Sequence, residues 1–135
     1  AIAGSREAAA ILDCFGLDDR HKEYIITAIR NHEAFKDVVQ ARDRYGELIS
    51  DALYDADKFR WGPDNFTTMI WEMLRHNQIP PDIFLENYKK GLDYIKRVKK
   101  TFRTDTAKAY GPEIIDQGLK IGNIIYKELK RYMSR

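Results

Sequence analysis

The chain has 135 residues, of which 44% are hydrophobic and 33% are charged, and its formal net charge is +2. This composition is ordinary for a soluble globular protein, and the length favours one domain with a real core. The near balance of charge gives no electrostatic case for a nucleic-acid or anionic-membrane partner, and no apolar run approaches the roughly 18 residues of a membrane span.

The first residues and the cysteine content predict the cellular compartment of the protein. The first residues, Ala1-Ile2-Ala3-Gly4-Ser5-Arg6, include no apolar segment of the kind found in a signal peptide. Cys14 is the only cysteine and cannot form a disulfide within the chain. We therefore expect a reducing, cytoplasmic location, with Cys14 as a core or boundary thiol.

The first two predicted helices are short. Helical spacing predicts a helix over residues 5–15, capped by Ser5 and ended by Gly16 in the left-handed conformation. Asp18 or Asp19 is expected to cap the second helix. The buried stripe of that second helix is predicted to comprise Tyr24, Ile25, Ala28 and Ile29.

Residues 33–46 give the least regular pattern in the chain. Residues 37–39 are apolar enough for a short helical turn, and a solvated loop follows them. A third helix is predicted over about 47–60. Its residues at three- and four-residue spacing predict a buried stripe of Ile49, Leu53, Ala56 and Phe59.

The second half of the chain predicts three more helices. Gly62-Pro63 breaks the third helix and leads into the fourth, and Asp82 is expected to cap a fifth over 83–102. A turn at 109–112 is then followed by a last helix over 113–132. No segment shows the period-two alternation of a strand, so the sequence predicts an all-α domain of six helices.

Several common catalytic motifs are absent from the sequence. There is no Gly-rich phosphate loop, no cysteine pair for zinc, no His-Glu-x-x-His motif and no nucleophile elbow. The candidates for chemistry are therefore three histidines, one cysteine and the acidic residues.

Two acids on the third predicted helix cannot serve the same site. Asp55 and Asp57 are two residues apart, so on a helix they point about 200° apart. Asp57 falls beside Leu53 and Trp61, at the edge of the predicted apolar stripe. A carboxylate in that position needs a partner, either a basic side chain or a divalent cation, and spacing alone does not decide between them.

The histidines have both structural and chemical interpretations. His32 follows an apolar stripe at the end of the second helix, where it can act as a dipole-stabilised cap, a metal ligand or a proton-transfer group. His21 is expected to be solvated and His76 to cap the fourth helix. The basic residues between Lys89 and Arg103 are expected to form a solvated helix face.

Two motifs together point to a family. Ile25-Ile26-Thr27-Ala28-Ile29-Arg30-Asn31-His32 is followed, after about twenty residues, by Leu53-Tyr54-Asp55-Ala56-Asp57-Lys58-Phe59. This pair resembles the second half of the HD-domain metal-dependent phosphohydrolases. The helix and Gly-Leu turn at 6–17 resemble the segment that precedes these motifs in the family, so the resemblance covers roughly residues 5–61.

The resemblance implies an HD-domain-like helical fold around a divalent metal ion, which is Mn, Mg, Fe or Zn, and a small phosphorylated substrate such as a nucleotide. It assigns Asp57 as the family's last metal ligand. It places His32 in the site, where some members bind a second metal. Lys58 or Arg60 is a candidate to bind substrate phosphate, although no family motif fixes that role.

The sequence departs from the family in its principal metal ligands. The family has a His and then an adjacent His-Asp pair before these motifs, whereas this chain contains no His-Asp dipeptide. The resemblance therefore implies that those ligands would lie before Ala1, with this chain supplying the C-terminal part of the site. The alternative is a non-catalytic helical module, or a degenerate HD relative, that packs against a partner or a second copy through some of its aromatic residues (12% of the chain).

Overall fold

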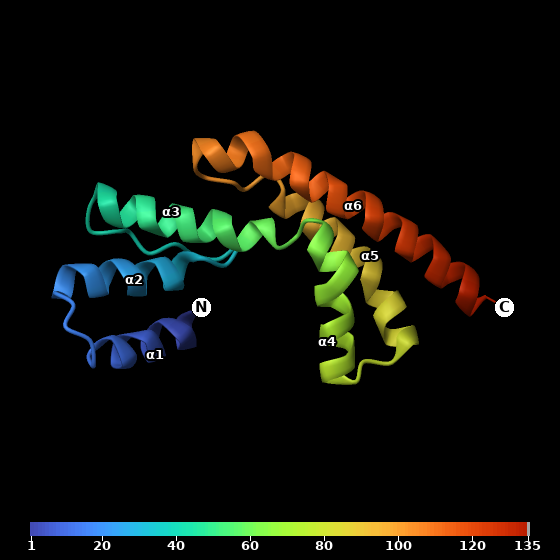
Figure 1. Cartoon of the computed structure of the whole chain (residues 1–135), viewed down its shortest axis with the longest axis horizontal. Coiled ribbons are helices and arrows are strands. Elements are labelled where there is room, and N and C mark those ends of the chain that lie inside the picture. Colours follow the sequence, from blue (N-terminus) through green and yellow to red (C-terminus); the bar gives the residue numbers. More distant parts are fainter. Residues whose placement is uncertain (135) are drawn as a thin grey trace. The chain divides into compact units, whose positions relative to one another are not determined.

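The fold is all-α, as the sequence predicts (Figure 1). The computed structural model describes residues 1–134, and within that range there is no strand. None of the helices in the described range is long and apolar enough to cross a membrane. The elements are α1 (Ile2–Leu12), α2 (Asp19–Asn31), α3 (Arg44–Phe59), a π-helix (Asn65–Met69), α4 (Ile70–Asn77), α5 (Pro81–Val98) and α6 (Asp105–Met133).

The contacts within the chain divide it into two compact units. Unit 1 comprises Ala1–Asp57 together with Phe102–Ala107, and therefore holds α1, α2 and most of α3. Unit 2 comprises Lys58–Thr101 and the residues from Lys108 onward, and holds α4, α5 and most of α6.

In unit 1, α1 and α2 run antiparallel. Gly4 lies close to Ile29, and Lys22 forms a 3.0 Å ion pair with Asp13 at the other end of the two helices. The side chain of Asp18 accepts a hydrogen bond from the backbone N–H of His21, so Asp18 is the N-cap of α2.

The start of α1 differs from the prediction. The helix begins at Ile2, and Ser5 lies inside it with its buried hydroxyl donating to the Ile2 carbonyl. Gly16 does not adopt a positive φ, because α1 ends at Leu12 and Asp13 closes it in the right-handed conformation. Cys14 is exposed in the turn that follows, so the prediction of a core or boundary thiol was wrong.

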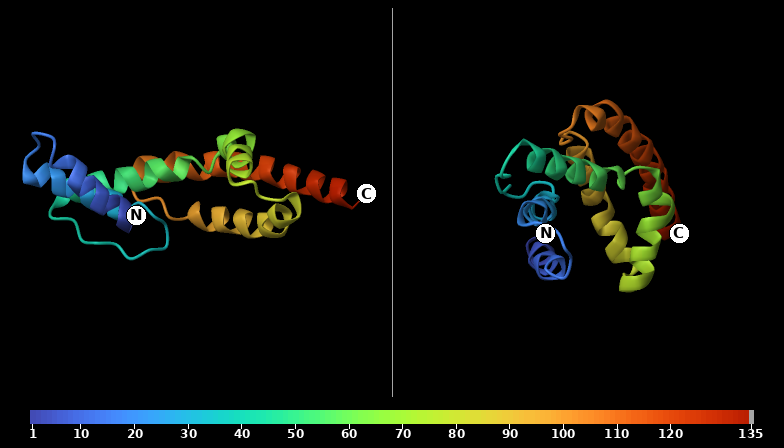
Figure 2. Two further views of the ribbon diagram at one scale, coloured as in Figure 1. Left: turned by 90° about the horizontal axis from the view of Figure 1, so that it is seen from below. Right: turned by 60° about the vertical axis from the view of Figure 1, so that its left-hand side comes forward.

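α2 and α3 lie side by side and run in the same direction (Figures 1 and 2). Tyr24 packs against Gly46, where a Cβ would approach the ring to 2.8 Å. Nearer the C-terminal end of α2, the side-chain amide of Asn31 donates to the hydroxyl of Ser50 at 3.2 Å. Ser50 lies one turn beyond Gly46 on α3. The connection between these helices contains no helical turn at 37–39.

The predicted buried stripe of α3 is wrong. Ile49 is 40% exposed and Leu53 is 39% exposed, while Ser50, Tyr54 and Asp55 are buried. The polar face of α3 is buried because its side chains have hydrogen-bond partners there. Ser50 accepts a hydrogen bond from Asn31 of α2, and Asp55 accepts hydrogen bonds from the backbone of residues 103 and 104. The apolar stripe consequently faces outward.

In unit 2, α5 and α6 run antiparallel and enclose an aromatic core. The hydroxyl of Tyr88 donates to the Gly122 carbonyl at 3.1 Å, and Lys99 pairs with Asp116 at 2.8 Å. Apolar spacing predicts a buried face of Leu85, Tyr88, Leu92, Ile95, Val98 and Phe102 for this helix. The structure buries all of these residues except Leu85, which is half-buried, and Phe102 lies beyond the end of α5 at Val98.

The boundaries of α5 and α6 correct two predictions. α5 begins at Pro81 with Pro80 as its N-cap, not at a cap formed by Asp82, because proline is well suited to the first helical position. α6 runs through Pro112, where a turn was expected. Gly111 precedes that proline and has no Cβ to clash with the proline ring, which removes part of the steric cost of a helical conformation there.

Candidate functional site

His32 caps the C-terminus of α2 in a defined orientation. Its side chain is half-buried, and its Nδ1 lies 2.5 Å from the carbonyl oxygen of Ile29. Because a carbonyl oxygen only accepts hydrogen bonds, Nδ1 carries the proton and donates it. The neutral ring then has its lone pair on Nε2. A metal-binding histidine commonly shows this arrangement, and a simple capping histidine can show it too.

Asp57 lies in the last turn of α3 and is half-buried. The contact of Asn31 with Ser50 places the C-cap of α2 beside the middle of α3, and Asp57 lies seven residues, about 10 Å, further along that helix. These contacts do not bring His32 and Asp57 together, so their joint role in one metal site stays a prediction.

Asp55 has a structural role. Its carboxylate is 3% exposed and accepts two hydrogen bonds, from the backbone N–H of Arg103 at 2.9 Å and of Thr104 at 2.7 Å. The guanidinium of Arg103 forms an ion pair with Asp51 at 3.1 Å and lies over the ring of Tyr54 at 3.7 Å. These contacts hold residues 103 and 104, which precede α6, against α3.

The contacts of Asp55 explain why its carboxylate is occupied by the fold. Asp55 satisfies backbone donors at the start of α6, where an acid also complements the helix dipole. Asp57 stays the predicted metal ligand of the two.

His32 and Asp57 are suitable types of ligand for a divalent metal ion, but two ligands are too few to hold one. Imidazole and carboxylate are common ligands for Mn, Fe and Zn. Within residues 1–134, however, no group of three or more His, Cys, Asp and Glu side chains is placed to hold a metal ion. Two donors do not complete the coordination of such an ion, so His32 and Asp57 stay predicted ligands of a site that needs further ones.

The two residues predicted to bind substrate both belong to unit 2. Lys58 is only 2% exposed. Arg60 is exposed, and its guanidinium lies 4.5 Å from the ring centroid of Trp61. A role in phosphate binding stays a prediction for both residues.

Asp43 is a structurally important acid that the sequence analysis missed. It accepts backbone N–H bonds from Tyr45 at 2.9 Å and Gly46 at 3.1 Å, as a cap of α3, and a bond from the hydroxyl of Tyr24 at 2.6 Å. The bond from Tyr24 is the largest of the effects that lower the pKa of Asp43 to about 2. The preference of aspartate for the residue before a helix is the signal that could have identified it.

The other two histidines and most basic side chains of α5 lie on the surface. His21 is exposed beside Asp18, and His76 is exposed in the last turn of α4. The basic side chains within α5 are exposed, as predicted. Beyond its end the prediction is wrong at two positions, because Lys99 is half-buried and pairs with Asp116, and Arg103 is half-buried and pairs with Asp51.

Comparisons of the chain with models of protein families, with curated proteins and with solved structures give no match. The resemblance to HD-domain phosphohydrolases therefore depends on the sequence motifs at 25–32 and 53–59.

Proposed function

We propose that this chain contributes the C-terminal part of an HD-type, metal-dependent phosphohydrolase site, with Asp57 and His32 as metal ligands. The observation that supports the proposal best is the orientation of His32, whose Nδ1 lies 2.5 Å from the carbonyl oxygen of Ile29. This contact leaves Nε2 as the ring nitrogen that a metal ion would bind.

Each residue has a defined part in this proposal. Asp57 supplies a carboxylate oxygen and His32 supplies Nε2, while the remaining ligands come from outside this sequence. A divalent cation bound there would acidify a coordinated water and polarise a phosphoryl oxygen of the substrate. Asp55 does not bind the ion in this proposal. It holds α3, the helix that carries Asp57, against residues 103 and 104.

The test is phosphate release from p-nitrophenyl phosphate and from nucleotides by the full-length protein that carries this sequence, with and without Mn²⁺ or Mg²⁺. We expect metal-dependent hydrolysis that Asp57→Ala lowers at least a hundredfold, because a lost ligand removes charge stabilisation of the transition state. Asp64→Asn is the matched control, since Asp64 is exposed and makes no capping hydrogen bond. Equal activity in Asp57→Ala and wild type would contradict the proposal.

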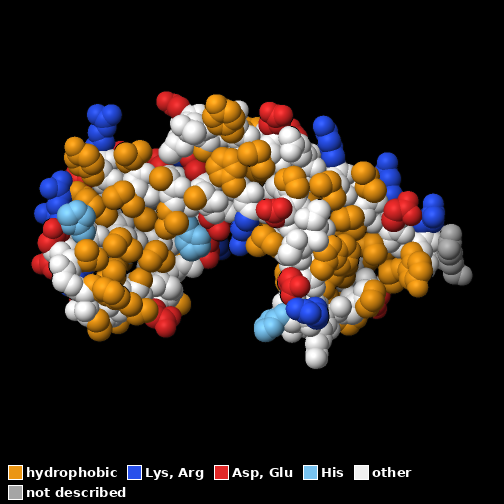
Figure 3. All heavy atoms as spheres, in the orientation of Figure 1, with side chains coloured by type: hydrophobic (Ala, Val, Ile, Leu, Met, Phe, Trp, Pro, Cys, Tyr) orange, Lys and Arg blue, Asp and Glu red, His pale blue; other side chains and the backbone are white. Residues whose placement is uncertain are grey.

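A second candidate function is that of a non-catalytic helical module that self-associates through α3. Its support is the outward-facing apolar row on that helix, in which Tyr45 is 68%, Leu48 59%, Ile49 40% and Leu53 39% exposed. Figure 3 shows hydrophobic side chains gathered over α1, α2 and α3 on the visible face. Contiguous exposed apolar surface of this kind is typical of an interaction face.

Sedimentation equilibrium tests whether the chain self-associates, as this second function requires. We expect the wild-type chain to dimerise at micromolar concentration, and Leu53→Ser to weaken the dimer at least tenfold, because a hydroxyl replaces apolar contact area. Ile124→Ser is the control, since Ile124 is also exposed but lies on α6 in unit 2. A monomeric wild type, or an unchanged dimer in Leu53→Ser, would exclude this function.

A further inference from the structure

The charged residues of the chain are divided unevenly between the two units. Unit 1 holds 8 Lys and Arg and 13 Asp and Glu, a formal charge of −5, whereas unit 2 holds 15 Lys and Arg and 8 Asp and Glu, a formal charge of +7. The net charge of +2 for the whole chain conceals these opposite values. The balance that argues against a polyanionic partner for the chain as a whole does not apply to unit 2, whose field attracts anions.

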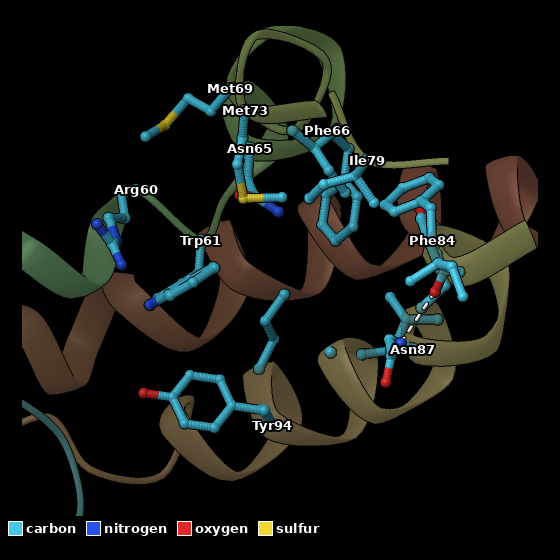
Figure 4. Close-up of a pocket in the computed structure, with 16 residues that line it drawn as sticks. Arg60, Trp61, Asn65, Phe66, Met69, Met73, Ile79, Phe84, Asn87 and Tyr94 are labelled. Carbon is cyan, nitrogen blue, oxygen red and sulfur yellow. Dashed lines mark hydrogen bonds between the residues drawn. The ribbon is translucent and has the colours of Figure 1, made fainter. Parts of the chain in front are cut away.

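Unit 2 has two hollows of different character. The one between α5 and the segment that forms the π-helix and α4 has apolar and aromatic walls almost throughout (Figure 4). The other lies between α5 and α6, has a volume of about 740 Å³, and is called the α5–α6 hollow below. Its charged wall residues are four lysines and two acids, namely Lys96, Lys99, Lys108, Lys120, Glu113 and Asp116.

The lysines of the α5–α6 hollow differ in how far the fold already uses them. Lys99 is partly buried and pairs with Asp116 at 2.8 Å. Lys96 pairs with Asp93 at 2.8 Å, but both side chains are more than half exposed, and ion pairs of this kind contribute little to stability. The side chain of Lys120 is exposed and forms no hydrogen bond or ion pair within the described part of the chain. Lys120 is therefore the cation in these walls that is most readily available to a ligand.

Two more lysines extend the basic surface beyond the hollow. Lys100 follows Lys96 by four residues, in the turn after α5, and Lys127 lies two helical turns after Lys120 on the same face of α6. Both are exposed, and neither side chain forms a hydrogen bond or ion pair within residues 1–134. Figure 3 shows Lys and Arg side chains that project from the outer edge of α6. Cations that the fold does not use thus lie on both helices.

We propose that the α5–α6 hollow and the lysines beside it bind a single strand of nucleic acid through its phosphates, without preference for base sequence. A positively charged groove that follows the strand is the usual site for such binding. On α6 the lysines from 108 to 127 span about 28 Å, which is too long for one phosphate group but suits a chain of them. A bilayer surface is flat and would reach only the projecting side chains, so the hollow favours a strand over a membrane.

The experiment is fluorescence anisotropy of a fluorescein-labelled oligothymidylate of about 20 nucleotides, titrated with the chain between about 50 and 200 mM NaCl. We expect micromolar binding at the lowest salt concentration. The logarithm of the affinity should fall linearly with the logarithm of the salt concentration, with a slope of about −3, because each of about four neutralised phosphates contributes roughly −0.7.

The test variant combines Lys100→Gln with Lys120→Gln. Neither side chain has a partner within the described residues, so the two substitutions remove charge without breaking a contact of the fold. We expect at least tenfold weaker binding at about 50 mM salt and a slope that is shallower by about 1.4. Arg6→Gln with Arg44→Gln is the matched control, since both residues are exposed in unit 1 and the loss of charge is the same. The control should bind like the wild type, and both variants should keep the helical circular dichroism.

Four outcomes would overturn the proposal. The first is the absence of binding at the lowest salt concentration, and the second is an equal loss of affinity in the test variant and the control. The third is displacement of the strand by poly-L-glutamate at the same concentration of charges, which would assign the surface to an acidic protein. The fourth is tighter binding to phosphatidylserine vesicles than to the strand, which would assign it to a membrane. None of these results depends on hydrolytic activity at His32 and Asp57.

Discussion

At the residue scale, the two aspartates of the motif at 53–59 differ in burial and in the role that we propose for each. Asp55 is buried and accepts backbone N–H bonds from Arg103 and Thr104. Asp57 is half-buried at the end of α3. Because they lie two residues apart on a helix, they point to different sides, and one can stabilise the fold while the other serves a site.

This difference in burial predicts effects of different size for two matched substitutions. Asp55→Ala should lower the free energy of unfolding by about 2 kcal/mol, because two N–H groups lose a charged acceptor in a partly buried environment. Asp57→Ala should change the stability less. Urea denaturation followed by circular dichroism measures both, and a larger loss of stability in Asp57→Ala than in Asp55→Ala would reverse these assignments.

At the element scale, the packing of unit 2 requires the turn at residues 61–62 to lie very close to α6. A Cβ at Gly118 would lie 2.6 Å from the carbonyl carbon of Gly62 and 2.7 Å from the carbonyl oxygen of Trp61. Both contacts are with backbone atoms, which cannot rotate away as a side chain would. The turn after α3 can therefore pack on α6 only while residue 118 has no side chain.

Two glycine substitutions test this packing. Gly118→Ala should destabilise the protein by about 1–3 kcal/mol, since the added methyl overlaps backbone. Gly91→Ala should stabilise it by about 0.5–1 kcal/mol, because Gly91 is a helical residue with open space around it and alanine is the better helix former. Thermal unfolding of the two variants decides the point, and a neutral Gly118→Ala would mean that the turn can shift at little cost.

The helices differ in how well the sequence predicts them. The stripe on α5 is predicted correctly because its buried residues are apolar and recur at helical spacing. The stripe on α3 is wrong because Asp55 is buried by donors 48 and 49 residues away in the chain, which no local pattern reveals. The sequence predicts a turn at 109–112, but Gly111 permits the helix to continue through Pro112.

At the scale of the whole molecule, the sequence predicts the all-α class, and the structure confirms it over residues 1–134. The division into two compact units is not predicted, because no linker composition marks it and the segment 102–107 returns to unit 1 from far along the chain. The candidate site is identified from two motifs alone. Their geometry became visible only once the packing of α2 on α3 was known.

The central claim is that His32 and Asp57 are ligands in one metal site, and Mn²⁺ binding tests it most directly. Electron paramagnetic resonance of free Mn²⁺ gives the affinity of the full-length protein without reference to any substrate. We expect at least a tenfold loss of affinity in Asp57→Ala and in His32→Ala, and no change in Asp64→Asn. Wild-type affinity in both Asp57→Ala and His32→Ala would contradict the claim and favour the interaction module.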